Sequence, residues 1–395
     1  MNILYVSYLF TPLEELLTGS EKDTSIPSFR LPLLKLVSLG HNVDFITCST
    51  KDFFVDVKLE GLKNQNLIKK IVYSNKNLGG KLKCVFQQLV VVLKTLFTRK
   101  YDFIYCHGSQ TFISTLVAFL LRVPCAHRLY GIVDFYDCLV QKGKAVAFIK
   151  DTQNYLSFLI PKSFLLVTED GSRGKEAYKL LRIPKSRYRF ECWTNGTEFK
   201  IIGDILNSGP VPVHTYIFHA ARVCPIKRQD RIIEVLHLLH LRGNLLHLYF
   251  AGAWENEEDF CYYWRVVQKY HLENYVHFMG AISKDYLRNM AYHAVATVLM
   301  GDVSNKGNVF LEIFSIGGTI MSIDDGSLDE YIINEKNGFL IQNELEACEK
   351  IEELLKCPET KLAIQIEALK TAKEKIVSWD ERIQKEIQLI MDTVN

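Results

Sequence analysis

Residues 304–338 read SNKGNVFLEIFSIGGTIMSIDDGSLDEYIINEKNG. The polar turn SNKGN precedes an apolar run, VFLEIFSI, which predicts a helix that ends at Gly317 and Gly318. TIMSI then predicts a strand, and DDG predicts a turn. Glu312 lies within the apolar run, and a buried carboxylate needs a hydrogen-bonding partner. One interpretation gives it a structural partner. The other lets it accept hydrogen bonds from a ligand at the N-terminus of its helix, where N–H groups suit phosphate.

The length and composition of the chain limit its class. Its 395 residues favour two domains of comparable size. The hydrophobic fraction of 48% and charged fraction of 23% are typical of a soluble globular protein, and a net charge of +2 argues against nucleic-acid binding. The ten cysteines form no CxxC pair, which predicts reduced thiols in a cytoplasmic protein. The start, MNILYVSYLF, lacks a basic leader, so we expect a strand there and not a signal peptide.

Short apolar segments alternate with helix-like segments, which is the pattern of a parallel sheet with crossover helices. IIGDILNSGPVPVH at residues 201–214 predicts a linker between two such series. Predicted strands cover residues 3–7, 41–47, 67–73, 103–105, 126–129, 164–168 and 189–192, and then 215–220, 246–251, 276–279, 296–299 and 319–323. Predicted helices include residues 81–98, 110–121, 142–158, 172–181, 228–241, 258–270, 284–291, 309–316 and 328–334, followed by a helical tail from residue 344.

The predicted fold class is therefore α/β, with two doubly wound Rossmann-like domains facing across a cleft. We expect an N-terminal domain over residues 1–205 and a C-terminal domain over 206–377, with a last helix at 378–395. Open α/β sheets bind ligands at the carboxyl ends of their strands, where the strand order reverses. The fold alone does not set the chemistry.

A basic turn follows the first strand of the second series, in IFHAARVCPIKRQDRIIEVL at residues 217–236. Arg222 and Lys227 lie on this turn, just before a helix. Two cations at the carboxyl end of a strand suit a diphosphate, because Arg binds it by bidentate hydrogen bonds and Lys as a point charge. The alternative is a solvated basic turn that also includes Arg228 and Arg231.

Six segments, in order, resemble the GT-B glycosyltransferases, and among them the large retaining family numbered four, of the group 1 type. They are GHNVDFIT at residues 40–47, WTNG at 193–196, AARVCPIKRQD at 220–230, VHFMGAISKDYL at 276–287, Glu312 with the GGTIMSIDDGSLDEYIINEKNGFLI that follows, and IVSWDERIQKEI at 376–387. The resemblance covers nearly the whole chain. It implies that the last helix, which contains Trp379, crosses back onto the first domain.

The resemblance also implies the catalytic residues. Arg222 and Lys227 would hold the donor diphosphate, and Glu312 would bind the nucleotide ribose. Gly307 matches the glycine of the sugar-facing turn. The backbone N–H groups of the next three residues would bind donor phosphate or sugar: Asn308, Val309 and Phe310.

Other donor-binding positions follow from the same resemblance. Gly19 would lie in a first-domain loop over the donor, and the turn that begins at Gly280 would meet the base. Ser304 occupies the position of the family's first glutamate, eight residues before Glu312. A hydroxyl cannot supply that carboxylate, so we expect Asp302 or Asn305 to take part instead.

Tyr130, in HRLYGIVD, occupies the position of a histidine in the family. Tyrosine can hydrogen-bond a donor but does not titrate near neutrality as histidine does. His107 and His127 are expected nearby in the fold, and one of them could stand in for the missing histidine.

The implied reaction is the metal-independent transfer of a sugar, with retention, from a nucleotide-diphosphate sugar to a glycan or lipid-linked acceptor. A role in polysaccharide biosynthesis would follow by analogy. Two fixed cations would stabilise the charge that grows on the leaving diphosphate. Asp324 and Asp325 are the nearest candidates for a metal motif, but DDG predicts a turn. We therefore expect no metal cofactor.

The segment KLKCVFQQLVVVLKTLFTRK at residues 81–100 contains five cations and no acidic residue. One interpretation is an ordinary amphipathic helix that packs on the core. The other is a surface that contacts an anionic membrane at its inner face, where a lipid-linked acceptor would lie.

Two rival functions remain at this point. A sugar-nucleotide epimerase shares the two-domain architecture, but it would need a pair of acid and base carboxylates in the first domain. A degenerate member of the family would bind a nucleotide sugar or a partner enzyme without turnover, and Ser304 and Tyr130 support that alternative.

Overall fold

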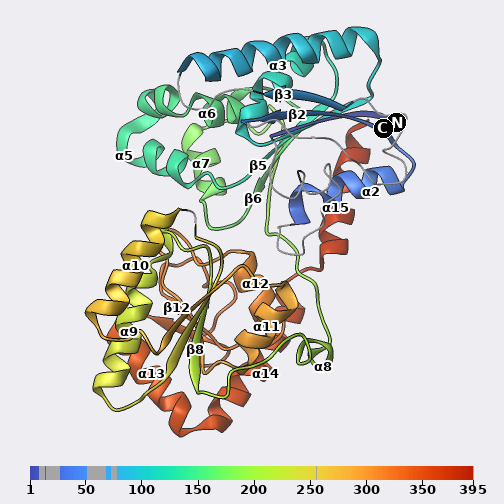
Figure 1. The fold of residues 1–395 in the computed structure, drawn as a ribbon. Helices are drawn as coiled ribbons and strands as arrows, with labels where there is room; N and C mark the ends of the chain where they lie inside the picture. Colours follow the sequence, from blue (N-terminus) through green and yellow to red (C-terminus); the bar gives the residue numbers. More distant parts are fainter. Residues whose placement is uncertain (9–13, 15–26, 51–67, 73–77, 255, 395) are drawn as a thin grey trace. The chain divides into compact units, whose positions relative to one another are not determined.

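The structure, a computed structural model, describes residues 1–8, 14, 27–50, 68–72, 78–254 and 256–394. It divides into two compact units: unit 1 contains Met1–Asn195 and Asp380–Asn395, and unit 2 contains Gly196–Trp379 (Figure 1). These boundaries differ from the expected ones at 205 and 377. The expected linker packs within unit 2, where the Asn289 side chain donates hydrogen bonds to the carbonyls of Leu206 and Gly209.

The sheet of unit 1 has seven parallel strands in the order β3-β2-β1-β4-β5-β6-β7. Apolar side chains such as Leu4, Val6 and Ile104 point to the face that packs against α3 and α4. Tyr5 and Tyr105 alternate with them and point to the opposite, aromatic face. The strands are β1 Asn2–Tyr8, β2 Asn42–Ser49, β3 Ile68–Val72, β4 Phe103–His107, β5 Cys125–Leu129, β6 Phe164–Thr168 and β7 Arg189–Trp193.

The helices of unit 1 are α2 Leu31–Ser38, α3 Leu78–Thr98, α4 Phe112–Leu120, α5 Val133–Lys150, α6 Thr152–Leu159, α7 Gly174–Leu181 and α15 Trp379–Val394. The prediction of one helix over residues 142–158 is wrong. The chain forms two helices there, because Asp151 accepts the N–H of Asn154 and so caps the start of α6. Among the helices in the described residues, none is long and apolar enough to cross a membrane.

Unit 2 repeats the architecture with six parallel strands in the order β10-β9-β8-β11-β12-β13. Figure 1 shows α9, α10 and α13 on one face of this sheet and α11, α12 and α14 on the other. The strands are β8 Tyr216–Ala220, β9 His247–Ala251, β10 Val276–Gly280, β11 Thr297–Leu299, β12 Ile320–Ile323 and β13 Phe339–Ile341. The helices are α8 Ile202–Ile205, α9 Gln229–Leu241, α10 Glu257–Lys269, α11 Lys284–His293, α12 Asn308–Phe314, α13 Glu344–Lys356 and α14 Pro358–Lys375.

The predicted helix over residues 328–334 is also wrong. The segment forms consecutive turns, and side chains compete with helical hydrogen bonding there. Asn337 accepts the N–H of Ile333 and donates to the carbonyl of Tyr331. Strand β13, which the sequence did not predict, follows directly. The fold class itself, two doubly wound parallel α/β domains, is confirmed.

Candidate active site

The strand order of unit 2 reverses at β8, which pairs with β9 on one side and β11 on the other. Two loops leave the carboxyl ends of these strands: the β8 loop, residues 221–228, and the β11 loop, residues 300–307. Ligands of open α/β sheets bind at such a point. Most of the sequence-predicted site residues lie on these two loops or on the helix that follows the second.

The β8 loop carries both predicted cations. Arg222 is exposed, and its carbonyl accepts a hydrogen bond of 2.9 Å from Gln229 at the start of α9. Lys227 is half-buried and runs along the β11 loop: its Cδ lies 3.8 Å from the position that a Cβ of Gly301 would take. The two cations therefore occupy a turn whose backbone is held by the neighbouring helix and loop.

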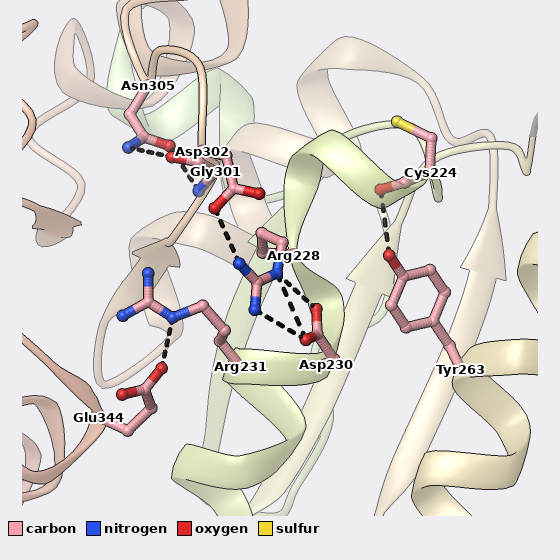
Figure 2. A network of polar contacts seen from close by, with 9 residues as sticks. All are labelled: Cys224, Arg228, Asp230, Arg231, Tyr263, Gly301, Asp302, Asn305 and Glu344. Carbon is pink, nitrogen blue, oxygen red and sulfur yellow. Dashed lines mark hydrogen bonds and ion pairs between the residues drawn. The ribbon is translucent and has the colours of Figure 1, made fainter.

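Arg228, which the alternative interpretation of the sequence placed in a solvated basic turn, ties the two loops together through Asp302 (Figure 2). Its Nη1 donates to Asp302 Oδ1 at 2.8 Å, and its Nε and Nη2 each donate to Asp230 at 3.1 Å. The N–H of Asp302 donates to the carbonyl of Ile226 at 3.0 Å. Hydrogen bonding to Asp230 raises the pKa of the Arg228 guanidinium, so the residue stays charged.

The polar turn at the start of the quoted stretch faces inward. Asn305 Oδ1 accepts the N–H of Gly301 at 3.1 Å, and Ser304 Oγ accepts the N–H of Lys306 at 3.1 Å. Ser304, Asn305 and Lys306 are each at most 8% exposed. The Nζ of Lys306 lies 3.2 Å from a carboxylate oxygen of Glu330. The amide of Asn305 and the hydroxyl of Ser304 thus shape the β11 loop.

Helix α12 follows at Asn308. Gly307 precedes it with φ −113° and ψ −179°, an extended backbone that any residue adopts, and a Cβ there would meet open space. Glu312 is 9% exposed on the second turn. Val309 is half-buried, and the Phe310 ring packs against Phe314 in the core, so Phe310 can offer a ligand only its backbone.

The β10 end of unit 2 holds the predicted base-binding turn. Gly280 has φ 68°, and its carbonyl accepts the N–H of Gly252 at 2.8 Å. Ser283 caps α11 by accepting the N–H of Tyr286 at 3.3 Å. Gly252 itself has φ 143°, and a Cβ there would lie 2.0 Å from the carbonyl oxygen of Ala221. Only glycine permits this close approach at the start of the β8 loop.

Tyr130 belongs to unit 1, where it follows β5. Its hydroxyl lies 2.9 Å from Nδ1 of His107, the last residue of β4, and the Arg128 guanidinium lies 4.9 Å from the centre of its ring. Burial and the charge of Arg128 lower the pKa of His107 well below its usual value, so its imidazole is neutral at pH 7. His127 is hydrogen-bonded inside the core instead. Gly19 lies outside the described residues.

A buried ionic cluster that was not predicted from the sequence lies beside Tyr130 and His107. Glu386 of α15 accepts hydrogen bonds from Nη1 of Arg128 at 2.8 and 3.0 Å, from Arg382 at 2.8 Å and from the Tyr105 hydroxyl at 2.5 Å. Arg128 and Glu386 are fully buried, and Arg382 is 2% exposed. The guanidinium of Arg382 stacks over Trp193 at 4.8 Å. These contacts hold the last helix in unit 1.

Both overlooked arginines have partners far away in the sequence, 74 residues for Arg228 with Asp302 and 258 for Arg128 with Glu386. The available signal was an arginine inside the apolar strand CAHRL, which requires a buried counter-charge. Asp325 accepts the N–H of Ser327, as expected of a turn. Across the described ranges, no group of three His, Cys, Asp or Glu side chains is arranged to hold a metal ion.

Solved structures cover this architecture from end to end. Alr3699/HepE from Anabaena, in complex with UDP, has 17% identity and a TM-score of 0.63, with 99% of this chain and 100% of that chain covered. Sucrose-phosphate synthase from Thermosynechococcus elongatus has 16% identity and a TM-score of 0.71, with 99% and 98% covered. A glycosyltransferase from Rickettsia africae has 13% identity and a TM-score of 0.65, with 100% and 98% covered.

The chain has the GT-B fold. Residues 210–371 match the family described as glycosyl transferases group 1. This range lies in unit 2 and includes both the β8 loop and the β11 loop. A comparison of the sequence with curated proteins gave no match.

Proposed function

We propose that this GT-B protein transfers a sugar from a nucleotide-diphosphate sugar to a glycan or lipid-linked acceptor. The observation that carries the proposal is the junction of the β8 and β11 loops, with Arg222 and Lys227 at the point where the strand order of unit 2 reverses. The group 1 match over residues 210–371 supports the reaction class. Alr3699/HepE, which shares the fold, is crystallised with UDP and with UDP-glucose, which supports this donor class.

The chemistry follows from the leaving group. Negative charge grows on the diphosphate as the glycosidic bond breaks, so fixed cations stabilise the transition state more than the ground state. Arg222 would donate two hydrogen bonds to one phosphate, and Lys227 would add a compact positive charge. Glu312 would accept hydrogen bonds from ribose hydroxyls. The backbone N–H groups of residues 308–310 would complete the phosphate and sugar contacts, and the turn at Gly280 would meet the base.

Two finer features complete the proposal. We expect retention of configuration at the anomeric carbon, since the six-segment resemblance is to a retaining family. We also expect no metal requirement, because the two loop cations can supply the charge that a divalent ion would otherwise provide. Activity that survives a metal chelator, and an α-linked product from an α-linked donor, are the corresponding results.

The test is substitution of the loop cations. Arg222→Ala and Lys227→Ala should each lower kcat by about 100-fold or more, since each removes a charge-stabilising donor from the transition state. Arg242→Ala is the matched control, because Arg242 pairs with Glu352 at the far end of α9 and should retain full activity. Near-normal turnover in either loop variant would rule out this assignment.

Product analysis separates the rival functions. Donor hydrolysis and transfer are measured with and without a panel of glycan and lipid-linked acceptors. An epimerised nucleotide sugar would identify an epimerase. Tight nucleotide binding with no product would identify a degenerate member that binds without turnover, as the Ser304 and Tyr130 positions would allow.

We further propose that helix α3 of unit 1 contacts the inner face of an anionic membrane. Three bulky apolar side chains stand on its outer surface: Leu82 is 60% exposed, Phe86 65% and Phe97 79%. Their spacing places them along one side of the helix over about 22 Å. Lys83 and Lys94 are exposed beside them, and the helix contains no acidic residue. An apolar stripe whose charged neighbours on the helix are all cations suits anionic lipid headgroups.

Vesicle co-sedimentation tests this contact. The protein should bind phosphatidylglycerol vesicles at low salt and lose most of that binding when Phe86 and Phe97 are replaced by Ser. Leu362→Ser with Ile366→Ser is the matched control, because these side chains of α14 are 55% and 58% exposed but lie on a helix of mixed charge. Equal effects of the two pairs, or binding that ignores salt, would contradict the contact.

A further inference from the structure

One carboxylate in the β11 loop, that of Asp302, is half exposed. The side chains of Ser304, Asn305 and Lys306 are turned inward and are at most 8% exposed, whereas the side chain of Asp302 is 50% exposed. Its Oδ1 is bound by Arg228, and the described part of the chain provides Oδ2 with no hydrogen-bond donor (Figure 2). Among residues 302, 304, 305 and 306, Asp302 is therefore the one that presents a polar group outward.

Arg228 fixes the direction of that carboxylate. Its guanidinium grips Asp230 through Nε and Nη2 and reaches Asp302 with Nη1, so its plane is set by two carboxylates. The backbone of Asp302 is anchored separately, through its N–H to the carbonyl of Ile226. Asp302 is thus held at its carboxylate by the Arg228 side chain and at its backbone by a hydrogen bond to the β8 loop, which also carries Lys227.

The backbone of Arg228 is unusual for its residue type. It has φ 52° and ψ 47°, the left-handed conformation that favours glycine. A non-glycine residue persists there when its surroundings hold it. Here the Arg228 side chain is itself fixed, because it donates hydrogen bonds to Asp230 at the start of α9 and to Asp302 in the β11 loop.

We propose that Asp302 binds hydroxyl groups of the transferred sugar and that Arg228 is the positioning residue that aims it. This inference rests on the proposed function, since it requires a sugar attached to the diphosphate that the β8 loop would hold. A carboxylate with one oxygen held by a cation can accept hydrogen bonds from hydroxyls with the other, and such charge-assisted bonds are the strong ones. Asp302 then selects for donors with free sugar hydroxyls and has no role toward the nucleotide.

The test compares two kinds of ligand on the full-length protein. Isothermal titration calorimetry first identifies which of UDP, GDP and ADP binds, and then measures that nucleotide with and without an attached hexose. Asp302→Ala should weaken nucleotide-sugar binding by about 10- to 100-fold, the range for a hydrogen bond to a charged group, and leave free nucleotide binding within about twofold. Equal losses for both ligands, or no loss for either, would overturn the assignment.

Substitutions at Arg228 test the positioning role. Arg228→Gly tolerates the left-handed backbone and removes the side chain with its guanidinium, so it should reproduce the selective loss of nucleotide-sugar affinity. Arg228→Lys should restore part of it, because Lys can reach Asp302 but cannot grip Asp230 in the same plane. Arg228→Ala adds backbone strain and should lower the melting temperature further than Arg228→Gly does. Loss of free nucleotide binding in Arg228→Gly would indicate a structural role instead.

The design distinguishes the two levels of failure. If the unmodified protein binds none of the three nucleotides and none of their hexose derivatives, the proposed function fails. If nucleotide and nucleotide sugar bind normally and Asp302→Ala affects them alike, only the role of Asp302 and Arg228 fails.

Discussion

Each sheet of this molecule reverses its strand order once, but the two units hold their charged side chains differently. In unit 1 the charges of Arg128, Arg382 and Glu386 are withdrawn from solvent and bonded to one another. In unit 2 Arg222 is exposed, and the side chains of Arg228 and Asp302 are 34% and 50% exposed. The arginines of unit 1 are thus buried in ion pairs, whereas those named in unit 2 are at least partly exposed to solvent.

The difference in burial determines whether the charged groups of each unit are available to a ligand. A buried ion pair has lost its hydration and must stay paired, so it fixes geometry and cannot exchange partners for a ligand. A half-exposed pair contributes little to stability, but its groups remain available. We therefore expect substitutions in the cluster of unit 1 to affect folding, and substitutions in the loops of unit 2 to affect binding.

The largest effect should come from Glu386→Ala. The substitution leaves two buried guanidinium groups and the Tyr105 hydroxyl without their shared acceptor, which should cost about 3–5 kcal/mol of unfolding free energy. Urea denaturation followed by circular dichroism measures it. Glu353→Ala is the control, since Glu353 pairs with Lys350 while 60% exposed and should change stability by less than about 1 kcal/mol. Similar values for the two variants would abolish the distinction between the units.

Gly252→Ala should come next and should act on unit 2. The added Cβ would meet the Ala221 carbonyl at 2.0 Å, so the β8 loop must move, at a cost of about 3 kcal/mol from strain and displacement. Gly243→Ala is matched to it, because φ there is 85° but the Cβ would meet open space, which limits the cost to about 1 kcal/mol. Nucleotide affinity, measured by calorimetry, should fall in Gly252→Ala alone. Retained affinity there would show that the β8 loop tolerates displacement.

Much of the fold could be predicted from local sequence. Strands buried on both faces are continuous apolar runs, so FLLVT at residues 164–168 was predicted with its observed bounds. The three-residue strand β13 was missed because a short apolar segment after polar turns carries almost no periodicity. The helix expected at 328–334 failed because Asn337, which holds the turns, acts from outside that segment.

The candidate site was accessible to sequence reasoning only where its parts are local. Arg222 and Lys227 stand five residues apart after an apolar strand, which indicates a cationic turn. The role of Arg228 depends on a left-handed backbone and on Asp302, and neither is encoded nearby. Tyr130 was a candidate because it occupies the position of a histidine in the family that the sequence resembles. Its contact with His107 depends on the pairing of β4 with β5 in the sheet, which local sequence does not reveal.

The smallest effect concerns two buried histidines, one in each unit, whose environments should make them equivalent. Burial is the main cause that lowers the pKa of His127 to about 3 and that of His219 to about 4, with further lowering by Lys162 and Lys227 respectively. Below the unfolded pKa of about 6.5, the unfolded chain binds a proton that the folded chain refuses, so stability falls as pH falls. Each histidine should therefore cost at most about 2 kcal/mol between pH 6.5 and 5. His127→Gln and His219→Gln should each flatten the pH dependence of urea denaturation by that amount, and similar flattening would mean that burial sets this property in both units. A clearly larger change in His219→Gln would instead show that the exposed charges of unit 2 reach its core.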